Sequence, residues 1–156
     1  MACRLFPCDI FFVHRDDENA TPESRISEIQ EAVAILAGVP FASHVCVIPV
    51  RMTEAWFLFN EEAIRMAAGN PNGNEPLELP RLAEVEHLHD PKDILHKQLE
   101  TASGLAKRRL SNFRPQERVH RLAQLITDFS PLKALGAFSQ LIHQTKSVLD
   151  SLNSDK

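Results

Sequence analysis

Hydrophobic and polar positions form three blocks along the first fifty residues. The run DIFFV (9–13) is short, aromatic and β-branched, which is typical of a strand buried on both faces of a sheet. From Pro22 to Gly38, apolar residues recur at spacings of three and four, which predicts an amphipathic helix with Ile26, Ile29, Val33 and Leu36 inward. HVCVIPV (44–50) predicts a second strand. Strand, helix and strand within about forty residues predict a βαβ unit with parallel strands.

The remaining residues have helical spacing. Thr53 is a candidate N-cap for a helix over 54–68, which Gly69 ends. Asp90-Pro91 is typical of the start of a helix over 92–102. Two further helices are expected, and their inward-facing residues are Val119, Leu122, Ile126 and Phe129 after Pro115, and Leu135, Phe138, Ile142 and Leu149 after Pro131. We therefore predict an α/β fold.

Length and composition agree with one domain. The chain has 156 residues, of which 44% are hydrophobic and 24% charged, enough for a single core. We expect a βαβ-helix part over 1–69, a helical part over 70–152 packed on it, and a tail over 153–156. No run of about eighteen apolar residues occurs, and Pro7 and Asp9 interrupt the N-terminal apolar block, so we expect a cytoplasmic protein without membrane contact.

The three cysteines show no C-x-x-C pair and no even disulfide framework. We therefore expect reduced thiols, with Cys46 as a small core residue, and no cysteine-based zinc site.

Charge is unevenly distributed. Residues 1–91 hold six Lys or Arg against fifteen Asp or Glu, whereas residues 92–121 hold eight against three. The segment GLAKRRLSNFR (104–114) is expected to be a loop that gathers cations around Phe113, and its candidate phosphate-binding residues are Lys107, Arg108, Arg109 and Arg114. A solvated basic surface is the alternative interpretation.

Acids follow the first predicted strand. His14-Arg15-Asp16 differs from a kinase catalytic loop, since Thr21 stands where that loop has a metal-binding Asn. In an extended chain Asp16 and Glu18 point the same way beyond a strand end, where open parallel sheets bind ligands. Glu54, after the second strand, is a third candidate catalytic carboxylate. These oxygens suit Mg²⁺, with Asp16 and Glu18 as its ligands; the alternative is a solvated loop whose acids stabilise a helix N-terminus.

Other chemistry has little support in the sequence. No G-x-x-x-x-G-K-[ST], G-x-G-x-x-G or G-x-S-x-G motif occurs. His87 and His89 have no further zinc-ligand spacing, so a loop before a capped helix is the favoured interpretation.

Four segments spread over most of the chain carry a family resemblance. They are CDIFFVHRDDE, VCVIPVRMTEAWFLFNEEAIRMAAGNPNG, DPKDILHKQLETASGLAKRRLSNF and DFSPLKALGAF. With them the sequence resembles a bacterial family of uncharacterised proteins, domain of unknown function 4276, which is regarded as Toprim-like. The Glu-Ala-Trp tripeptide after a strand, with the later Asp-Pro-Lys, is the most specific part of the resemblance.

The resemblance implies a doubly wound sheet and a magnesium site. Toprim domains of topoisomerases, primases and nucleases hold Mg²⁺ through a Glu after one strand and a D-x-D after a later one. Asp16 and Glu18 match the D-x-D, but no residue matches the upstream Glu, and Glu54 follows a later strand. We therefore expect either a further N-terminal part before Met1 or a reduced site.

Two functions follow as expectations. The first is Mg²⁺-dependent, nuclease-like phosphoryl transfer on nucleic acid, in bacterial phage defence. The second is a non-catalytic Toprim-like module that binds a partner protein or nucleotide. Candidate partners are nucleic acid, an ATPase partner protein, and a second copy of the chain joined through an exposed sheet edge.

Overall fold

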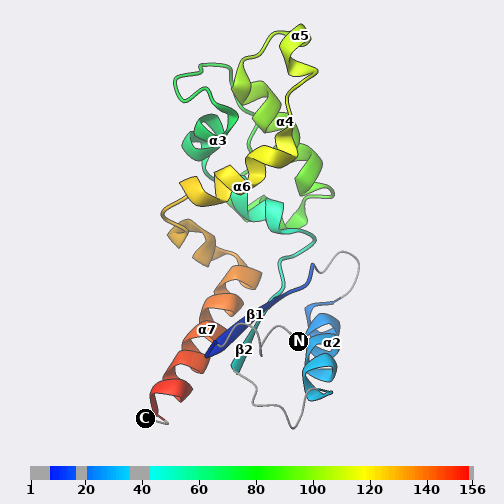
Figure 1. Ribbon diagram of the computed structural model, residues 1–156, viewed down its shortest axis with the longest axis vertical. Coiled ribbons are helices and arrows are strands. Elements are labelled where there is room, and N and C mark those ends of the chain that lie inside the picture. The colour runs from blue at the N-terminus through cyan, green and yellow to red at the C-terminus, as the bar shows by residue number, and fades with distance from the viewer. Residues whose placement is uncertain (1–7, 17–20, 36–42, 155–156) are drawn as a thin grey trace. The chain divides into compact units, whose positions relative to one another are not determined.

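The computed structural model describes residues 8–16, 21–35 and 43–154 (Figure 1). The chain divides into two compact units, residues 1–50 with 136–156, and residues 51–135. The fold is mixed α/β, with a parallel strand pair in the first unit and a helical C-terminal half. None of the helices in the described ranges combines the length and apolar character that a bilayer crossing requires.

The predicted strand pair is present in the first unit. Strand β1 (Ile10–His14) pairs in parallel with β2 (Ser43–Val47), with Phe12 opposite Val45. The prediction that β1 is buried on both faces is wrong, because the Phe12 side chain is 57% exposed. Its register partner Val45 is only 1% exposed, so the face that carries Phe12 is open at β1 and covered at β2.

Helix α2 (Pro22–Ala34) packs against the strand pair. The Thr21 hydroxyl accepts from the Ser24 N–H at 3.2 Å, so the helix begins with a cap followed by proline, as predicted. Its Ile29 forms a buried cluster with Cys46 and Ile48, and Cys46 is confirmed as a core residue. The partly buried side chains around the cluster are Val13, Ile26 and Val33. Leu36 lies outside the described residues.

Helix α7 (Gly136–Ser154) packs beside β2. The Val47 carbonyl accepts from Arg15 on the β1 side, so Cys46, one residue earlier, directs its N–H to the opposite edge. There the Gln144 Oε1 accepts it at 3.2 Å. The Gln144 side chain thus accepts the hydrogen bond that a third strand would accept at this edge of β2.

The start and the buried face of α7 differ from the prediction. Pro131 lies in a short 3-10 turn, η3 (Ser130–Ala134), and the extended backbone of Leu135 separates that turn from α7. Ile142 and Leu149 were expected inward, but they are 43% and 45% exposed, because α7 turns Gln144 toward β2 instead. Leu135 and Phe138 are buried, as predicted.

The second unit is built from short helices around one core. They are η1 (Thr53–Phe57), α3 (Glu61–Ala68), η2 (Leu82–His87), α4 (Pro91–Ser103), α5 (Lys107–Leu110), α6 (Pro115–Leu125) and η3. Helix α3 packs on α4 and α6. The fully buried leucines and isoleucine of this core are Leu58, Ile64, Leu95, Leu99, Leu122 and Leu132.

One long helix was predicted over 54–68, and this is wrong. The Asn60 Oδ1 accepts from the Ala63 N–H at 2.9 Å and starts α3 anew, so η1 and α3 are separate elements. Thr53 is the first residue of η1 rather than a cap. Trp56 is buried, as expected for a core residue. The cap at Asp90 is confirmed, since its Oδ1 accepts from the Asp93 N–H at 2.9 Å.

Candidate functional site

Asp16 lies just beyond the C-terminal end of β1. The backbone continues the ladder past the strand, because the Arg15 N–H donates to the Val47 carbonyl at 3.0 Å. Asp16 and His14 are two residues apart in this extended stretch and share a side. The Asp16 Oδ1 lies 3.2 Å from the His14 Nε2, and the carboxylate remains 32% exposed. The predicted strand-end carboxylate is therefore in place, with an imidazole as its neighbour.

Arg15 points to the other side and takes part in a charged cluster with α2. Its Nη2 lies 3.0 Å from the Glu28 Oε1, while the Arg25 Nη1 donates to the Glu28 Oε2 at 2.9 Å. Hydrogen bonds from Arg25 and then Arg15 hold the pKa of Glu28 below its usual value. This glutamate is occupied by two cations of its own unit, so it is a poor metal ligand.

Of the other two predicted carboxylates, only Glu54 is among the described residues. Glu18, like Asp17, lies outside the described residues. Glu54 is a half-buried residue of η1, in the unit formed by 51–135. Within the described ranges, no three His, Cys, Asp or Glu side chains are grouped so that they could hold a metal ion. One carboxylate beside an imidazole does not by itself fit Mg²⁺, which is bound through oxygen ligands in octahedral geometry.

Basic side chains gather on α5 and α6 in the second unit. Lys107, Arg108 and Arg109 occupy the single turn of α5, which stands at one end of the unit in Figure 1, and all three are exposed. The loop predicted over 104–114 contains one helical turn, in which the Leu110 N–H donates to the Ala106 carbonyl at 3.0 Å; the residues on either side of it are irregular. The side chains of these three successive cations therefore leave the turn in different directions, and each of them reaches solvent.

A second group of arginines continues along α6. Arg114 precedes the helix, and Arg118 and Arg121 follow at spacings of four and three, which places all three along one side. Arg118 and Arg121 were counted in the sequence as part of the basic segment but not as candidate site residues. Their spacing from Arg114 after a helix-starting proline is the signal that identifies them.

Phe113 anchors this arrangement. Its ring is only 8% exposed, and the Arg118 guanidinium carbon lies 5.6 Å from the ring centroid. The Arg114 Nη1 donates to the Ser111 carbonyl at 3.2 Å and to the Phe113 carbonyl at 3.3 Å. We call the exposed cations Lys107, Arg108, Arg109, Arg114, Arg118 and Arg121 the basic surface.

The basic surface is not neutralised by the described chain. None of its six cations forms an ion pair with a carboxylate in the described ranges. Glu117 is the single acidic residue among positions 107–121. Elsewhere in the same unit, Lys97 pairs with Asp93 at 2.6 Å and Arg81 pairs with Glu84. Some cations of this unit are thus paired with a carboxylate, whereas those of the basic surface are not.

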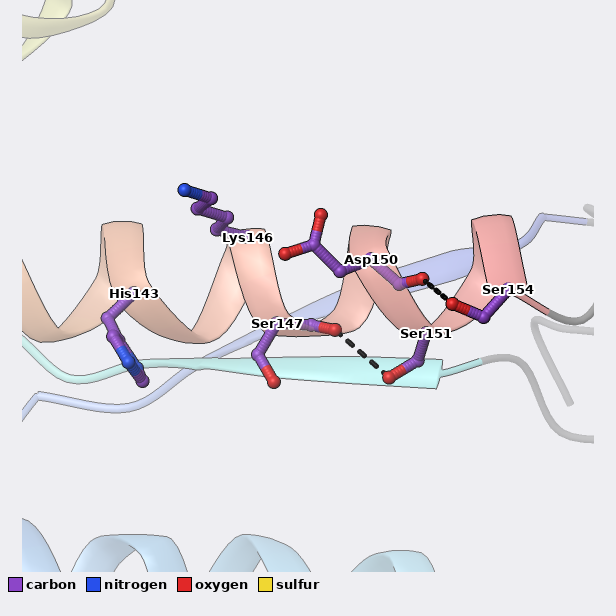
Figure 2. A pocket seen from close by; sticks show the side chains of 6 residues that line it. All are labelled: His143, Lys146, Ser147, Asp150, Ser151 and Ser154. Atoms are coloured by element: carbon purple, nitrogen blue, oxygen red, sulfur yellow. Dashed lines mark hydrogen bonds between the residues drawn. The ribbon is translucent and has the colours of Figure 1, made fainter.

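Three hollows were considered as binding sites. One, of 640 Å³, is lined only by α7 residues (Figure 2), and the Ser151 and Ser154 hydroxyls there donate to carbonyls of α7 itself. A second, of 330 Å³, lies among α2, β2 and α7 beside Cys46, whose thiol pKa is raised by burial. Such a thiol is a weak nucleophile.

The third hollow, also 330 Å³, lies at the base of α5 in the second unit. Its lining residues are Glu75, Glu100, Thr101, Gly104, Leu105 and Leu110. The two carboxylates give it the opposite charge to the neighbouring basic surface, so it does not extend that surface as a phosphate site.

Comparisons with protein-family models, curated protein sequences and solved structures returned no significant match. The Toprim-like resemblance therefore remains a prediction from the sequence.

Proposed function

We propose that this protein binds the phosphate backbone of nucleic acid through its basic surface. The observation that carries the proposal is the excess charge there: over positions 107–121, six exposed cations stand against one acid, with no ion pair to a carboxylate of the described residues. Arg114, Arg118 and Arg121 share one side of α6, and like charges at this spacing repel one another and lower the stability of the fold. A polyanion relieves that repulsion and gains entropy from the counterions it releases.

The salt dependence of binding tests this proposal. Affinity for a labelled nucleic acid is measured by fluorescence anisotropy over a series of KCl concentrations, for the wild type and for the variant K107A/R108A/R109A. Removing three phosphate contacts should lower the slope of log affinity against log salt concentration by about 2 to 3. An unchanged slope overturns the proposal.

A control variant separates location from net charge. R81A/K97A/K133A removes the same number of exposed cations from the same unit, outside the basic surface. Arg81 and Lys97 are engaged with Glu84 and Asp93, and surface pairs of this kind contribute little to stability. The control should keep the wild-type slope. A slope reduced as strongly as in the test variant would show that only net charge matters.

A second candidate function is Mg²⁺-dependent, nuclease-like phosphoryl transfer in phage defence, within a Toprim-like fold. It is favoured by one observation, the Asp16 carboxylate beyond the C-terminal end of a strand in a parallel pair. In this hypothesis Asp16 and Glu18 hold the metal ion and Glu54 is the third catalytic carboxylate. Free thiols at Cys8 and Cys46 support a cytoplasmic setting.

Asp16→Ala tests the second candidate. Binding of Mg²⁺ or Mn²⁺ is measured by calorimetry, and cleavage of DNA and RNA is followed on gels. Asp150→Ala is the matched control, since it removes an exposed carboxylate of α7 in the same unit. If ion binding and cleavage survive in Asp16→Ala, this candidate is wrong.

If the wild type binds nucleic acid without cleaving it, the non-catalytic module is favoured. An ATPase partner protein and a homodimer remain further proposals. Co-purification with the ATPase tests the first of these proposals. The molecular mass measured by analytical ultracentrifugation tests the homodimer.

A further inference from the structure

The two edges of the small sheet differ. At the outer edge of β2, the Gln144 side chain accepts the hydrogen bond of the Cys46 N–H. Among the described residues, β1 pairs with β2 alone. Because the Arg15 N–H turns toward β2 and backbone groups alternate in direction along a strand, Phe12 directs its N–H and carbonyl away from β2. Within residues 8–16, 21–35 and 43–154 neither group has a hydrogen-bond partner. The β1 edge is therefore open at Phe12.

The Phe12 side chain is exposed on the same strand. It is 57% exposed, although its register partner Val45 is only 1% exposed. Edge strands that stay unpaired are commonly protected by a lysine, a proline or a covering element, and the strand sequence IFFVH contains neither of these residues. The β1 edge thus combines available backbone groups with an apolar ring, and such an edge favours pairing with another strand.

The exposed apolar side chains also favour this unit as an interface. The large hydrophobic residues that are exposed in the described ranges all belong to the first unit, and they are Phe12, Ile35, Ile142 and Leu149. The second unit is described without gaps and contributes none of them. Contact with another protein surface is therefore expected at the first unit.

The charges at the two ends of β1 select the orientation of a second copy. Asp9 directly precedes the strand, Arg15 directly follows it, and both are exposed. An antiparallel copy of β1 brings each Asp9 close to the Arg15 of the other chain, whereas a parallel copy brings like charges together. Arg15 already contacts Glu28, but its side chain is still 51% exposed and can reach a further carboxylate.

The position of Phe12 defines the register. Phe12 is the central residue of β1, so a two-fold axis through it pairs the strand with its copy over the whole length. The two Phe12 residues then exchange both backbone hydrogen bonds, with their Cα atoms about 5.5 Å apart and their rings on one face. The two-stranded sheet becomes a four-stranded one, and sheets in globular proteins usually have about four to six strands.

We propose that the β1 edge is a homodimer interface, in which two copies of the chain pair antiparallel about a two-fold axis through Phe12. The interface lies in the first unit and requires no nucleic acid. The inference is therefore independent of the basic surface and goes beyond the proposed function.

Sedimentation equilibrium of the full chain, freed of nucleic acid, tests the interface. Phe12→Lys places two like charges opposite each other at the axis, so it should raise the dissociation constant of the dimer by about tenfold or more. Leu149→Lys is the matched control, because it adds the same charge at another exposed apolar residue of this unit, and it should keep the wild-type constant. A monomeric wild type overturns the inference, and so does a Phe12→Lys variant that dimerises like the wild type.

Disulfide cross-linking tests the register without a change of charge. In a background with Cys3 and Cys8 replaced by Ser, Phe12→Cys places two thiols on Cα atoms about 5.5 Å apart, which is within disulfide range. A covalent dimer should form under mild oxidation and be visible on a non-reducing gel. Ile35→Cys, at a position that is 84% exposed in the same unit, should cross-link much more slowly at the same concentration. Equal rates for the two variants contradict the register.

Hydrogen exchange of the Phe12 amide identifies any other occupant of the edge. In the proposed dimer this amide is protected, and its protection decreases as the protein is diluted. Protection in a monomer at every concentration would mean that another segment of the same chain pairs with β1. Protection only after a different protein is added would mean a heterologous partner. Either of these results overturns the inference.

Discussion

Both units contain paired charges, but the second unit also carries a group of exposed cations without a carboxylate partner among the described residues. In the unit of 1–50 and 136–156, Glu28 is held between Arg15 and Arg25, and Asp16 lies beside His14. In the unit of 51–135, the basic surface has no carboxylate partner within the described chain. Charges that are paired within a unit stabilise that unit. Cations without such a pair can instead form ion pairs with an anionic ligand. The contrast favours the second unit as the binding unit.

The largest expected effect comes from the core beneath the basic surface. Leu99 is fully buried on α4, so Leu99→Ala should lower the free energy of unfolding by about 2 to 5 kcal/mol. Urea unfolding followed by the fluorescence of Trp56, the chain's single tryptophan, reports on this unit. Leu149→Ala, on an exposed α7 position of the other unit, should change it by less than about 0.5 kcal/mol. Equal effects would show that Leu99 is not held in a tightly packed core.

A smaller effect compares one helix cap from each unit. Asn60 caps α3 at a half-buried site, and Thr21 caps α2 at an exposed one. Replacement of either by Ala should lower the free energy of unfolding by about 0.5 to 2 kcal/mol. We expect the larger loss for Asn60→Ala, because the Ala63 N–H is in a buried residue and water cannot readily replace the lost hydrogen bond. Thermal unfolding measures both. A larger loss for Thr21→Ala would contradict this ranking.

The smallest effect is the pH dependence of the paired charges in the first unit. The pKa of Glu28 is lowered from its ordinary value of 4.5 by Arg25 and Arg15. Its contribution to stability is therefore complete above that value, and it is lost as pH falls through the lowered folded pKa. NMR titration of the Glu28 carboxyl should give a midpoint below 4.5, and Arg25→Ala should raise it. An unshifted midpoint would show that the pairing does not persist in solution.

The sequence predicted those elements whose signals are local. The apolar run at Ile10–His14, the Thr21-Pro22 start of α2 and the Asp90-Pro91 start of α4 each combine a cap or a short run with little competition from distant contacts. The parallel register followed from the short helical connection, because such a crossover brings the second strand back in the same direction.

The sequence predictions were wrong where tertiary contacts determine the helix boundaries or the buried face of a helix. The apolar spacing across 54–68 is continuous, and only the bond of Asn60 to the Ala63 N–H reveals the break. Ile142 and Leu149 match an inward stripe, but the docking of Gln144 on β2 selects another face of α7. The exposure of the cations around Phe113 was predicted from charge, whereas burial of the ring depends on packing that periodicity does not encode.

The bond between Gln144 and the Cys46 N–H joins residues 98 positions apart. The intervening residues 51–135 form their own core, so the second unit is inserted within the first. Helix α7 is synthesised after the whole insert, so the free edge of β2 stays uncovered until residues 136–154 are made. Prior folding of the insert also replaces a long flexible loop by a compact one, which lowers the entropy lost when the outer unit closes. Closure of the outer unit thus depends on a segment of chain that is synthesised after the whole insert.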